Sequence, residues 1–442
     1  MNKQAGLLTT RSERMSYGSF FVGQNIIYIL VLSFLAQFYT DEVGLAPAAV
    51  ATLFLVARVW DAVNDPMLGA LVDKCNLKGG RFKPWINAVA VLMPLVTIAL
   101  FYNIGGSSTS NLIYAYVTYI LWGMIYTVSD VPIFALATAM TDNLDERVSL
   151  ISIGRLAAGI AGMIASVAAA PIIGALGWTG ATLVLMAIAL VTMIPIRFFT
   201  KERIVYDRQE NVSIKTMFEA VYKNKYLLIY YSAFIVMMSF NTGSAVGTYF
   251  ATYNLGNFDL FSVVMLVGIL PMMIIPVFLP KLITMMGKKK LFLVTTGVGI
   301  LVTLAQYFIG YSNFALFLVL SFIKGFALYT PMMMMGLFSA DCAEYGAYVT
   351  GKRNEGITFS IQTFSTKLGT AFAGFFGTML LGYYGYVANA AQSERAMNGI
   401  WKLMTLYPVI GMVIGFVIIY KFYDLEEADV KRMIDEMQMK AS

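Results

Sequence analysis

Apolar runs of about 20 residues or more recur along almost the whole length of this chain, separated by short polar stretches. A helix of that length crosses the hydrocarbon core of a bilayer, which is roughly 30 Å thick. Because lipid offers no hydrogen bonds to the backbone, a spanning run has to satisfy its own peptide groups as a helix. The strands of a membrane barrel would alternate polar and apolar residues, which these runs do not. The sequence therefore predicts an all-α membrane protein.

Counting these runs predicts about twelve transmembrane helices. They lie near residues 18–40, 48–73, 84–104, 111–141, 149–176, 178–198, 226–252, 260–285, 290–311, 313–340, 357–386 and 400–423. The longest polar stretch follows the sixth run, so the runs form two sets of six. Two pseudo-symmetric six-helix halves are typical of the major facilitator fold. We expect four parts: an N-terminal bundle (1–199), a cytoplasmic central loop (200–225), a C-terminal bundle (226–424) and a cytoplasmic tail (425–442).

Residue usage excludes several classes of protein. Charged residues make up 13% of the 442 residues, too few to cover a soluble protein of this size. The chain has no histidine, which removes the usual metal ligand and the usual proton carrier at neutral pH. Without histidine or a cluster of cysteines and acids, the chain lacks the nucleophile–base set or catalytic metal set that an enzyme needs. We therefore expect no enzymatic activity, and no cofactor apart from a coupling cation.

Basic residues gather on one side of the predicted membrane, in the N-terminal segment, the central loop and the loops on the same side. A glycine followed by basic residues occurs there twice, at Gly80-Arg81 after the second run and at Gly287-Lys288 after the eighth. By the positive-inside rule, both termini of this multi-pass protein are cytoplasmic, and the membrane is the inner (plasma) membrane. The net charge of +6 follows from this topology and gives no reason to expect nucleic acid as a partner.

Ionisable residues inside the predicted helices carry most of the functional information. Each costs about 2.5–3.5 kcal/mol at a helix centre, so its presence suggests a function. They are Arg58, Asp61, Asp65, Asp130, Arg155, Lys324 and Lys367. We expect Lys324 to extend to the membrane surface or to pair with Asp341 or Glu344.

The second run places two carboxylates on one helix face, because Asp61 and Asp65 are four residues apart. Asn64 lies on nearly the same face, and Arg58 is three residues before Asp61. Two carboxylates and an amide oxygen form a site of the kind that small hard cations prefer. The same pair could instead share a proton. The alternative is structural, with the acids paired to Arg58, Arg155 or Lys367.

The fourth and eleventh runs carry candidate cargo-binding residues. Tyr126, Asp130 and Phe134 follow one another at four-residue intervals, a strip on which a sugar could stack and donate hydrogen bonds. The aromatic residues alone would fit a lipid-facing or core role equally well. The eleventh run is polar around Gln362 and Lys367, although hydrogen bonds between helices could explain its neutral residues.

Several segments resemble the glycoside–pentoside–hexuronide:cation symporters, a family within the major facilitator superfamily. They are Ser16-Tyr17-Gly18, Phe38-Tyr39-Thr40-Asp41 with Gly44-Leu45, Arg58 to Pro66 with Gly69, Gly80 to Trp85, and Ala340 to Gly346. The resemblance extends from the first predicted helix to the eleventh, and the segment from Arg58 to Pro66 is its most specific part.

The resemblance implies the positions of three sets of functional residues. The cation site would contain Asp61, Asn64, Asp65 and Thr127, with Asp61 and Asp65 as the metal ligands if the ion is Na⁺. The sugar site would contain Gln24, Asn25, Tyr126, Asp130, Phe134, Arg155, Gln362, Thr363 and Lys367. Gating at the cytoplasmic loops would involve Asp73, Arg81, Asp341 and Glu344.

Two positions differ from the family members that carry melibiose. Asn25 replaces an aspartate of the first helix, and Phe134 replaces a tryptophan. One carboxylate fewer, with Arg155 and Lys367 retained, makes an anionic sugar easier to accept. We therefore expect a β-glycoside, a xyloside or a glucuronide rather than melibiose as the cargo.

The sequence as a whole predicts a monomeric secondary active symporter, surrounded by membrane lipid. It would couple uptake of a small sugar or glycoside to a monovalent cation, Na⁺ or H⁺, by alternating access. The alternative is an uncoupled facilitator or exporter of another amphiphile, such as a lysolipid or a drug, on the same fold. That alternative predicts no stimulation by sugars.

Overall fold

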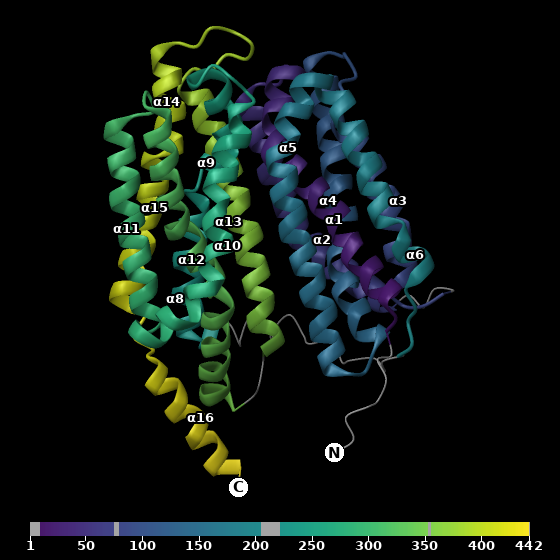
Figure 1. The fold of residues 1–442 in the computed structure, drawn as a ribbon, viewed down its shortest axis with the longest axis vertical. Coiled ribbons are helices and arrows are strands. Elements are labelled where there is room, and N and C mark those ends of the chain that lie inside the picture. The colour runs from purple at the N-terminus through teal and green to yellow at the C-terminus, as the bar shows by residue number, and fades with distance from the viewer. Residues whose placement is uncertain (1–8, 75–78, 205–221, 352–354, 442) are drawn as a thin grey trace. The chain divides into compact units, whose positions relative to one another are not determined.

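The computed structural model describes residues 9–74, 79–204, 222–351 and 355–441. The chain divides into two compact units, Met1–Glu210 and Asn211–Ser442 (Figure 1). Both units are bundles of long helices, as the apolar runs predict.

The first unit holds six predicted spans in fewer continuous helices. Its elements are α1 (Arg11–Gln37), the π-helical turn η1 (Phe38–Glu42), α2 (Pro47–Lys74), α3 (Lys83–Leu100), α4 (Ser108–Met140), α5 (Leu144–Met193) and α6 (Pro195–Phe199). Gly177 interrupts α5 with φ of +69° and ψ of 174°. Glycine adopts such a backbone conformation without steric cost, so one helical stretch ends there and another begins. Two predicted spans therefore lie within α5.

The second unit has the same general plan with more interruptions. Its elements are α8 (Lys225–Ser239), α9 (Gly243–Tyr249), the π-helical turn η2 (Phe250–Asn254), α10 (Leu260–Met286), α11 (Lys288–Ile309), α12 (Phe314–Thr350), α13 (Glu355–Tyr383), α14 (Glu394–Met404), α15 (Leu406–Phe422) and α16 (Glu427–Ala441). The seventh predicted span corresponds to α8, α9 and η2, and the twelfth corresponds to α14 and α15. The polar tail forms α16, which lies at one end of the unit (Figure 1).

The outer surfaces of these helices are apolar. Within the described residues, nine helices are long and apolar enough to cross a bilayer. Large apolar side chains face outward from them: Val277 on α10 is 73% exposed and Val191 on α5 is 72% exposed. Contiguous apolar surface of this kind is solvated by lipid rather than by water. The predicted all-α membrane fold is therefore confirmed.

One motif occurs at the same place in both units. Phe38 to Gly44 and Phe250 to Gly256 share the pattern Phe-x-Thr-x-x-(Val/Leu)-Gly, directly after the first long helical segment of each unit. In the first copy the N–H of Val43 donates to the carbonyl of Phe38 at 3.0 Å. In the second copy the N–H of Leu255 donates to the carbonyl of Phe250, also at 3.0 Å. The same hydrogen bond, from the N–H of residue i+5 to the carbonyl of residue i, therefore closes both turns. The glycine that follows each turn has a positive φ.

The phenylalanine that begins each π-helical turn occupies an equivalent aromatic cluster. Phe38 lies 5.5 Å from Trp178, between ring centroids, and Phe250 lies 5.5 Å from Trp401. Each tryptophan belongs to the sixth predicted span of its own unit. The matching backbone and matching aromatic partners indicate that the two units are related to each other. The sequence suggested this relation only through the glycine followed by basic residues in one loop of each half.

In each unit a glutamate side chain caps the N-terminal end of the third span. The carboxylate of Glu202 accepts hydrogen bonds from the N–H groups of Arg81 and Phe82, both at 2.8 Å, just before α3. In the second unit Glu427 accepts one from the N–H of Lys288, at 2.6 Å, at the start of α11. Both glutamates follow the sixth span of their own unit and satisfy N–H groups that a helix leaves without partners.

Replacing Glu202 with alanine is expected to lower the thermal stability of the protein. The substitution removes one carboxylate that serves several N–H groups of the loop and the first turn of α3, and loss of such a cap costs about 0.5–2 kcal/mol. Thermal unfolding in detergent measures the change. Glu202→Gln keeps an acceptor and is expected to lose less. Equal stability of Glu202→Ala and the unmodified protein would contradict this role.

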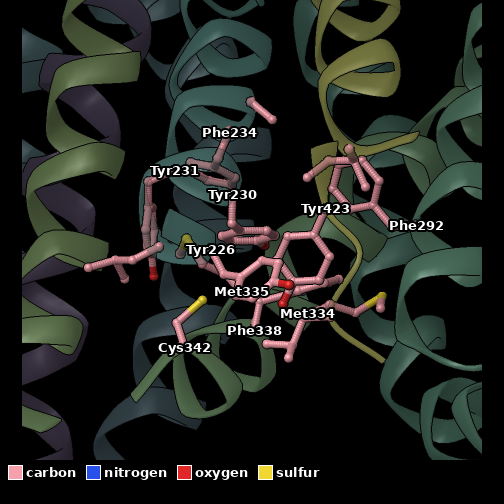
Figure 2. Close-up of a cluster of buried hydrophobic side chains, with 14 of the residues drawn as sticks. Tyr226, Tyr230, Tyr231, Phe234, Phe292, Met334, Met335, Phe338, Cys342 and Tyr423 are labelled. Carbon is pink, nitrogen blue, oxygen red and sulfur yellow. The ribbon is translucent and has the colours of Figure 1, made fainter. Parts of the chain in front are cut away.

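Aromatic side chains fill the core of the second unit close to α16. Tyr230 stacks on Phe338 with ring centroids 4.4 Å apart, and Tyr423 lies edge-on to Phe338 at 5.3 Å (Figure 2). Cys342 is buried in the same cluster. The side chains of α8, α12 and the segment after α15 are thus packed together, which fixes the helices that carry the polar residues of this unit.

Candidate functional site

An ion pair lies in the middle of α2. Nη1 of Arg58 lies 3.0 Å from Oδ2 of Asp61, one turn away along the helix. Both side chains are largely buried, at 19% and 12% exposure. The spacing of the two residues allowed this pair, which is also the one named by the structural alternative for the acids, and the role of Asp61 in a cation site stays a prediction.

The same carboxylate lies against α4 at a glycine. A β-carbon added to Gly123 would come within 2.9 Å of Oδ1 of Asp61, so a larger residue would displace the carboxylate. Thr127, one turn further along α4, is buried and donates to the carbonyl of Gly123 at 3.1 Å. Asp61 and Thr127, predicted as parts of one cation site, therefore both lie close to Gly123.

Asn64 is buried one turn after Asp61, at 3% exposure. Its amide nitrogen has no hydrogen-bond partner within the described residues. An asparagine amide can also be placed with its oxygen and nitrogen exchanged, so this group can present an oxygen in the same position. Asp65 and Asp73 lie in α2 as predicted, but their side chains fall outside the described part of the structure.

Stacked aromatic rings surround the predicted sugar strip on α4. The ring of Tyr126 lies between Trp122, at 5.2 Å, and Tyr28 of α1, at 5.5 Å between centroids. Asp130 lies one turn after Tyr126 on α4 and therefore shares its helix face. An acid beside aromatic faces is the combination that binds a polyhydroxylated ring.

Other predicted residues of the first unit take part in contacts between helices. Gln24 is buried, and its amide nitrogen donates to the hydroxyl of Ser129 at 2.7 Å, which joins α1 to α4. Asn25 is half-buried and donates to the carbonyl of Phe21 at 3.0 Å. Phe134 packs on Phe21, with centroids 5.5 Å apart. Gln24 and Phe134 therefore make contacts between helices, and their role in sugar binding stays a prediction.

Arg155 lies on α5 and its side chain is exposed. Gly154, the residue before it, faces Phe21 of α1, and a β-carbon there would lie 2.6 Å from the ring. The glycine therefore allows α5 to approach α1 closely while the guanidinium of Arg155 stays on the surface of the unit.

The second unit carries the remaining predicted residues on α12 and α13. Oε1 of Gln362 accepts a hydrogen bond from the hydroxyl of Ser339 at 2.9 Å, and Tyr231 of α8 hydrogen-bonds to the same serine. Thr363 is exposed and Lys367 is half-buried on α13. The polar character of the eleventh span therefore has one clear structural use, a bridge from α13 to α12 and α8.

The predicted gating residues lie among capping and pairing contacts. Asp341 of α12 forms an ion pair with Lys288 at the start of α11. Arg81 contributes its backbone N–H to Glu202, and Glu344 is half-buried on α12. The expected ion pair of Lys324 is wrong: among the described residues its ammonium group pairs with neither Asp341 nor Glu344 and instead donates to the carbonyl of Met404 at 2.8 Å.

Sequence reasoning missed three residues of this site: Gly123, Trp122 and Tyr28. Trp122 is four residues before Tyr126 and therefore shares its helix face, so the spacing could have identified it. Gly123 shares a face with Thr127 for the same reason. Tyr28 belongs to a different helix, and spacing within one run carries no information about it.

Comparison with known proteins places this arrangement in a family. The family described as MFS/sugar transport protein matches residues 16–427, nearly the whole chain. The chain belongs to this family. It is therefore a membrane transporter and not an enzyme, and its resemblance to the glycoside–pentoside–hexuronide:cation symporters is confirmed.

The sequences of individual relatives align with this chain over almost their full lengths. The chain is 35% identical over 438 residues to uncharacterized symporter YnaJ of Bacillus subtilis, covering 96% of this chain and 94% of the relative. It is 30% identical to the glucuronide carrier protein homolog of Escherichia coli, covering 94% and 93%. The solved nucleoside transporter NupG aligns with a TM-score of 0.68 over 93% of this chain and 99% of that one. At 12% identity that likeness shows the fold alone.

Proposed function

We propose that this transporter is a secondary active symporter, which couples uptake of a sugar or glycoside to Na⁺ or H⁺. The observation that carries the proposal is the position of Asp61, with one oxygen on Arg58 and the other against Gly123 beside Thr127. The name of one relative, a glucuronide carrier protein homolog, supports a sugar as cargo. The name of another, a symporter, supports coupling.

The charges of α2 support an exchangeable cation. Arg58 and Asp61 neutralise each other, while Asp65 adds a further formal negative charge to the same helix. A negative charge at membrane depth is costly, so binding of a proton or a monovalent cation to a carboxylate of α2 is favourable. Asn64 and Thr127 lie close by and offer oxygen atoms, the ligand type that Na⁺ and other hard cations prefer.

Cargo binding is proposed to use the aromatic and acidic strip of α4. Asp130 would accept hydrogen bonds from sugar hydroxyls, and the rings around Tyr126 would contact the apolar face of the sugar. Other residues of the first unit would contact the cargo as well, namely Gln24, Asn25, Phe134 and Arg155, and the candidates in the second unit are Gln362, Thr363 and Lys367. With Asn25 neutral and Arg155 exposed, a glucuronide is the favoured cargo, ahead of neutral β-glycosides and xylosides.

Alternating access is the proposed transport cycle, with the basic ends of both units in the cytoplasm. The basic end of the first unit carries Lys83 and Arg203. The basic end of the second unit carries Lys288 and Lys289. Cation binding would neutralise α2 and raise the affinity for sugar, and sugar would raise the affinity for the cation by the same factor.

A ligand panel on the purified protein tests the function. Intrinsic fluorescence and thermal shift are measured with glucuronides, neutral β-glycosides, xylosides and melibiose, each with Na⁺, with K⁺ and across a pH range. We expect a uronide to bind more tightly than its neutral glycoside, and the coupling cation to tighten binding about 5–150-fold. Equal competition by uronides and neutral glycosides would remove the preference for anionic cargo. Binding that no cation affects would contradict symport.

A further inference from the structure

The twelfth predicted span, which is the last of the second unit, is broken into two helices. Helix α14 ends at Met404 and α15 begins at Leu406, while Thr405 between them has φ of −128° and ψ of −66°. The seventh span is broken too, between Ser239 and Gly243, where α8 ends and α9 begins. Figure 1 places α9 and α14 at the same end of the unit, opposite to α16. Broken helices at membrane depth expose backbone groups that lipid cannot satisfy.

The last turn of α14 obtains partners from two spans. Thr405 covers two of its carbonyls: the hydroxyl donates to Trp401 at 2.6 Å, and the backbone N–H donates to Lys402 at 3.2 Å. The hydroxyl of Thr242, from the break in the seventh span, donates to the carbonyl of Leu403 at 2.7 Å. Thr242 is fully buried, so this contact lies in the interior of the unit.

Lys324 supplies the partner for the last carbonyl. Its ammonium group donates to the carbonyl of Met404 at 2.8 Å. Lys324 is ten residues after Phe314, the first residue of α12, which is about 15 Å along a helix axis and hence near the middle of a bilayer. All four terminal carbonyls of α14 therefore have partners, and the final one has a cation.

The charge of Lys324 is balanced by a helix end. The C-terminus of a helix carries a partial negative charge of roughly half an electron, and α14 ends directly at this ammonium group. Among the described residues, no carboxylate forms an ion pair with Lys324. Carbonyl groups at an interrupted helix end are also the groups that coordinate small monovalent cations in transporters built from discontinuous helices.

We propose that the break in the twelfth span is a monovalent-cation site, and that the ammonium group of Lys324 occupies it as a permanently attached cation. The first unit carries carboxylates for an exchangeable ion, whereas the second unit carries its own cation on a side chain. All the groups involved lie in the second unit, so the site does not depend on the identity of the cargo. Its ligand class is a small cation such as ammonium or methylammonium.

The competing explanation is that Lys324 contributes only its four-carbon chain to packing. Lys324→Met distinguishes the cation site from simple packing, because methionine keeps an unbranched apolar chain and removes the charge. Lys324→Arg keeps a charge and hydrogen-bond donors, and Lys324→Ala removes the whole side chain and opens the site. Lys402→Ala is the matched control, since Lys402 lies on α14 near the break but directs its ammonium group over the ring of Tyr384.

The experiment measures thermal unfolding of the four purified variants in ammonium, methylammonium or choline chloride at one ionic strength. We expect Lys324→Ala and Lys324→Met to unfold about 3–8 °C below the unmodified protein, and Lys324→Arg and Lys402→Ala to change much less. Ammonium or methylammonium is expected to restore at least half of the loss in Lys324→Ala, whereas choline is too large to enter. Neither ion is expected to help Lys324→Met, whose side chain fills the space.

Equal or higher stability of Lys324→Met would overturn the proposal, because the charge would then be unnecessary. Absence of any difference between ammonium and choline in Lys324→Ala would overturn the cation site itself. Should Lys324→Ala not fold, the unfolding temperatures of Lys324→Arg and Lys324→Met test the proposal. The proposal is supported if Lys324→Arg keeps the unfolding temperature and Lys324→Met lowers it. It is refuted if the two variants unfold at the same temperature. Failure of the sugar panel would leave these outcomes unchanged.

Discussion

Asp61→Asn is expected to abolish uptake of cargo against a gradient. Asparagine keeps the shape of the side chain and its contact with Gly123, but it removes the charge that pairs with Arg58. The guanidinium then loses its partner at 3.0 Å in a largely buried position, which is unfavourable for binding a second cation nearby. Radiolabelled uptake in vesicles, with and without a cation gradient, measures the loss.

Two comparisons make this result specific to coupling. Cargo binding to Asp61→Asn should persist but lose its dependence on the cation, which in coupled transporters is commonly 5–150-fold. Asp65→Cys is expected to behave in the same way. The double variant Arg58→Met with Asp61→Asn should recover stability, because it removes the unpaired charge, yet remain uncoupled. Concentrative uptake by either single variant would rule out the assigned cation site.

Asp130→Asn is expected to lower the affinity for cargo about 100-fold or more. Hydrogen bonds to a charged acceptor are worth roughly 1.5–3 kcal/mol each, and a carboxylate can accept two from neighbouring hydroxyls. Asparagine offers one acceptor and is neutral. Direct binding of the best ligand from the panel, measured by calorimetry or fluorescence, gives the change in Kd.

The matched control for Asp130 is Tyr126→Phe. It keeps the ring between Trp122 and Tyr28 and removes only the hydroxyl group, so we expect a loss of affinity of less than about tenfold. Asp130→Asn should still show normal thermal stability, since the substitution conserves volume. If its Kd stays within about threefold of the unmodified protein, Asp130 does not contact the cargo.

The sequence predicted the helices well because their cause is local. A run of apolar residues long enough to cross a bilayer has only one way to satisfy its backbone, and each predicted span coincides with helical residues. The pair of Arg58 and Asp61 was predictable for the same reason, as both groups lie on one turn of one helix. The boundary at Gly177 also follows from a single residue with positive φ.

Contacts between helices were not predictable in this way. Lys324 was expected to find an acid near the membrane surface, but its partner is a backbone carbonyl of α14, some 80 residues later in the sequence. Every residue has a backbone carbonyl, so the residue types do not show which carbonyl needs a partner. They do not show the break at Thr405 either, which exposes these carbonyls. Tyr28 beside Tyr126, and Gln24 beside Ser129, depend equally on how α1 packs against α4.

The matching turns that begin at Phe38 and Phe250 bear on the ancestry of the chain. Two copies of one irregular backbone ring, each beside a tryptophan of its own unit, are what duplication of a six-helix ancestor would leave behind. The capping glutamates Glu202 and Glu427 fit the same history. The scaffold features match between the two units, whereas the buried charges differ: the first unit has acids on α2, and the second has Lys324 on α12. Grafting charges between equivalent positions of the two halves would therefore be a rational way to redesign ion coupling.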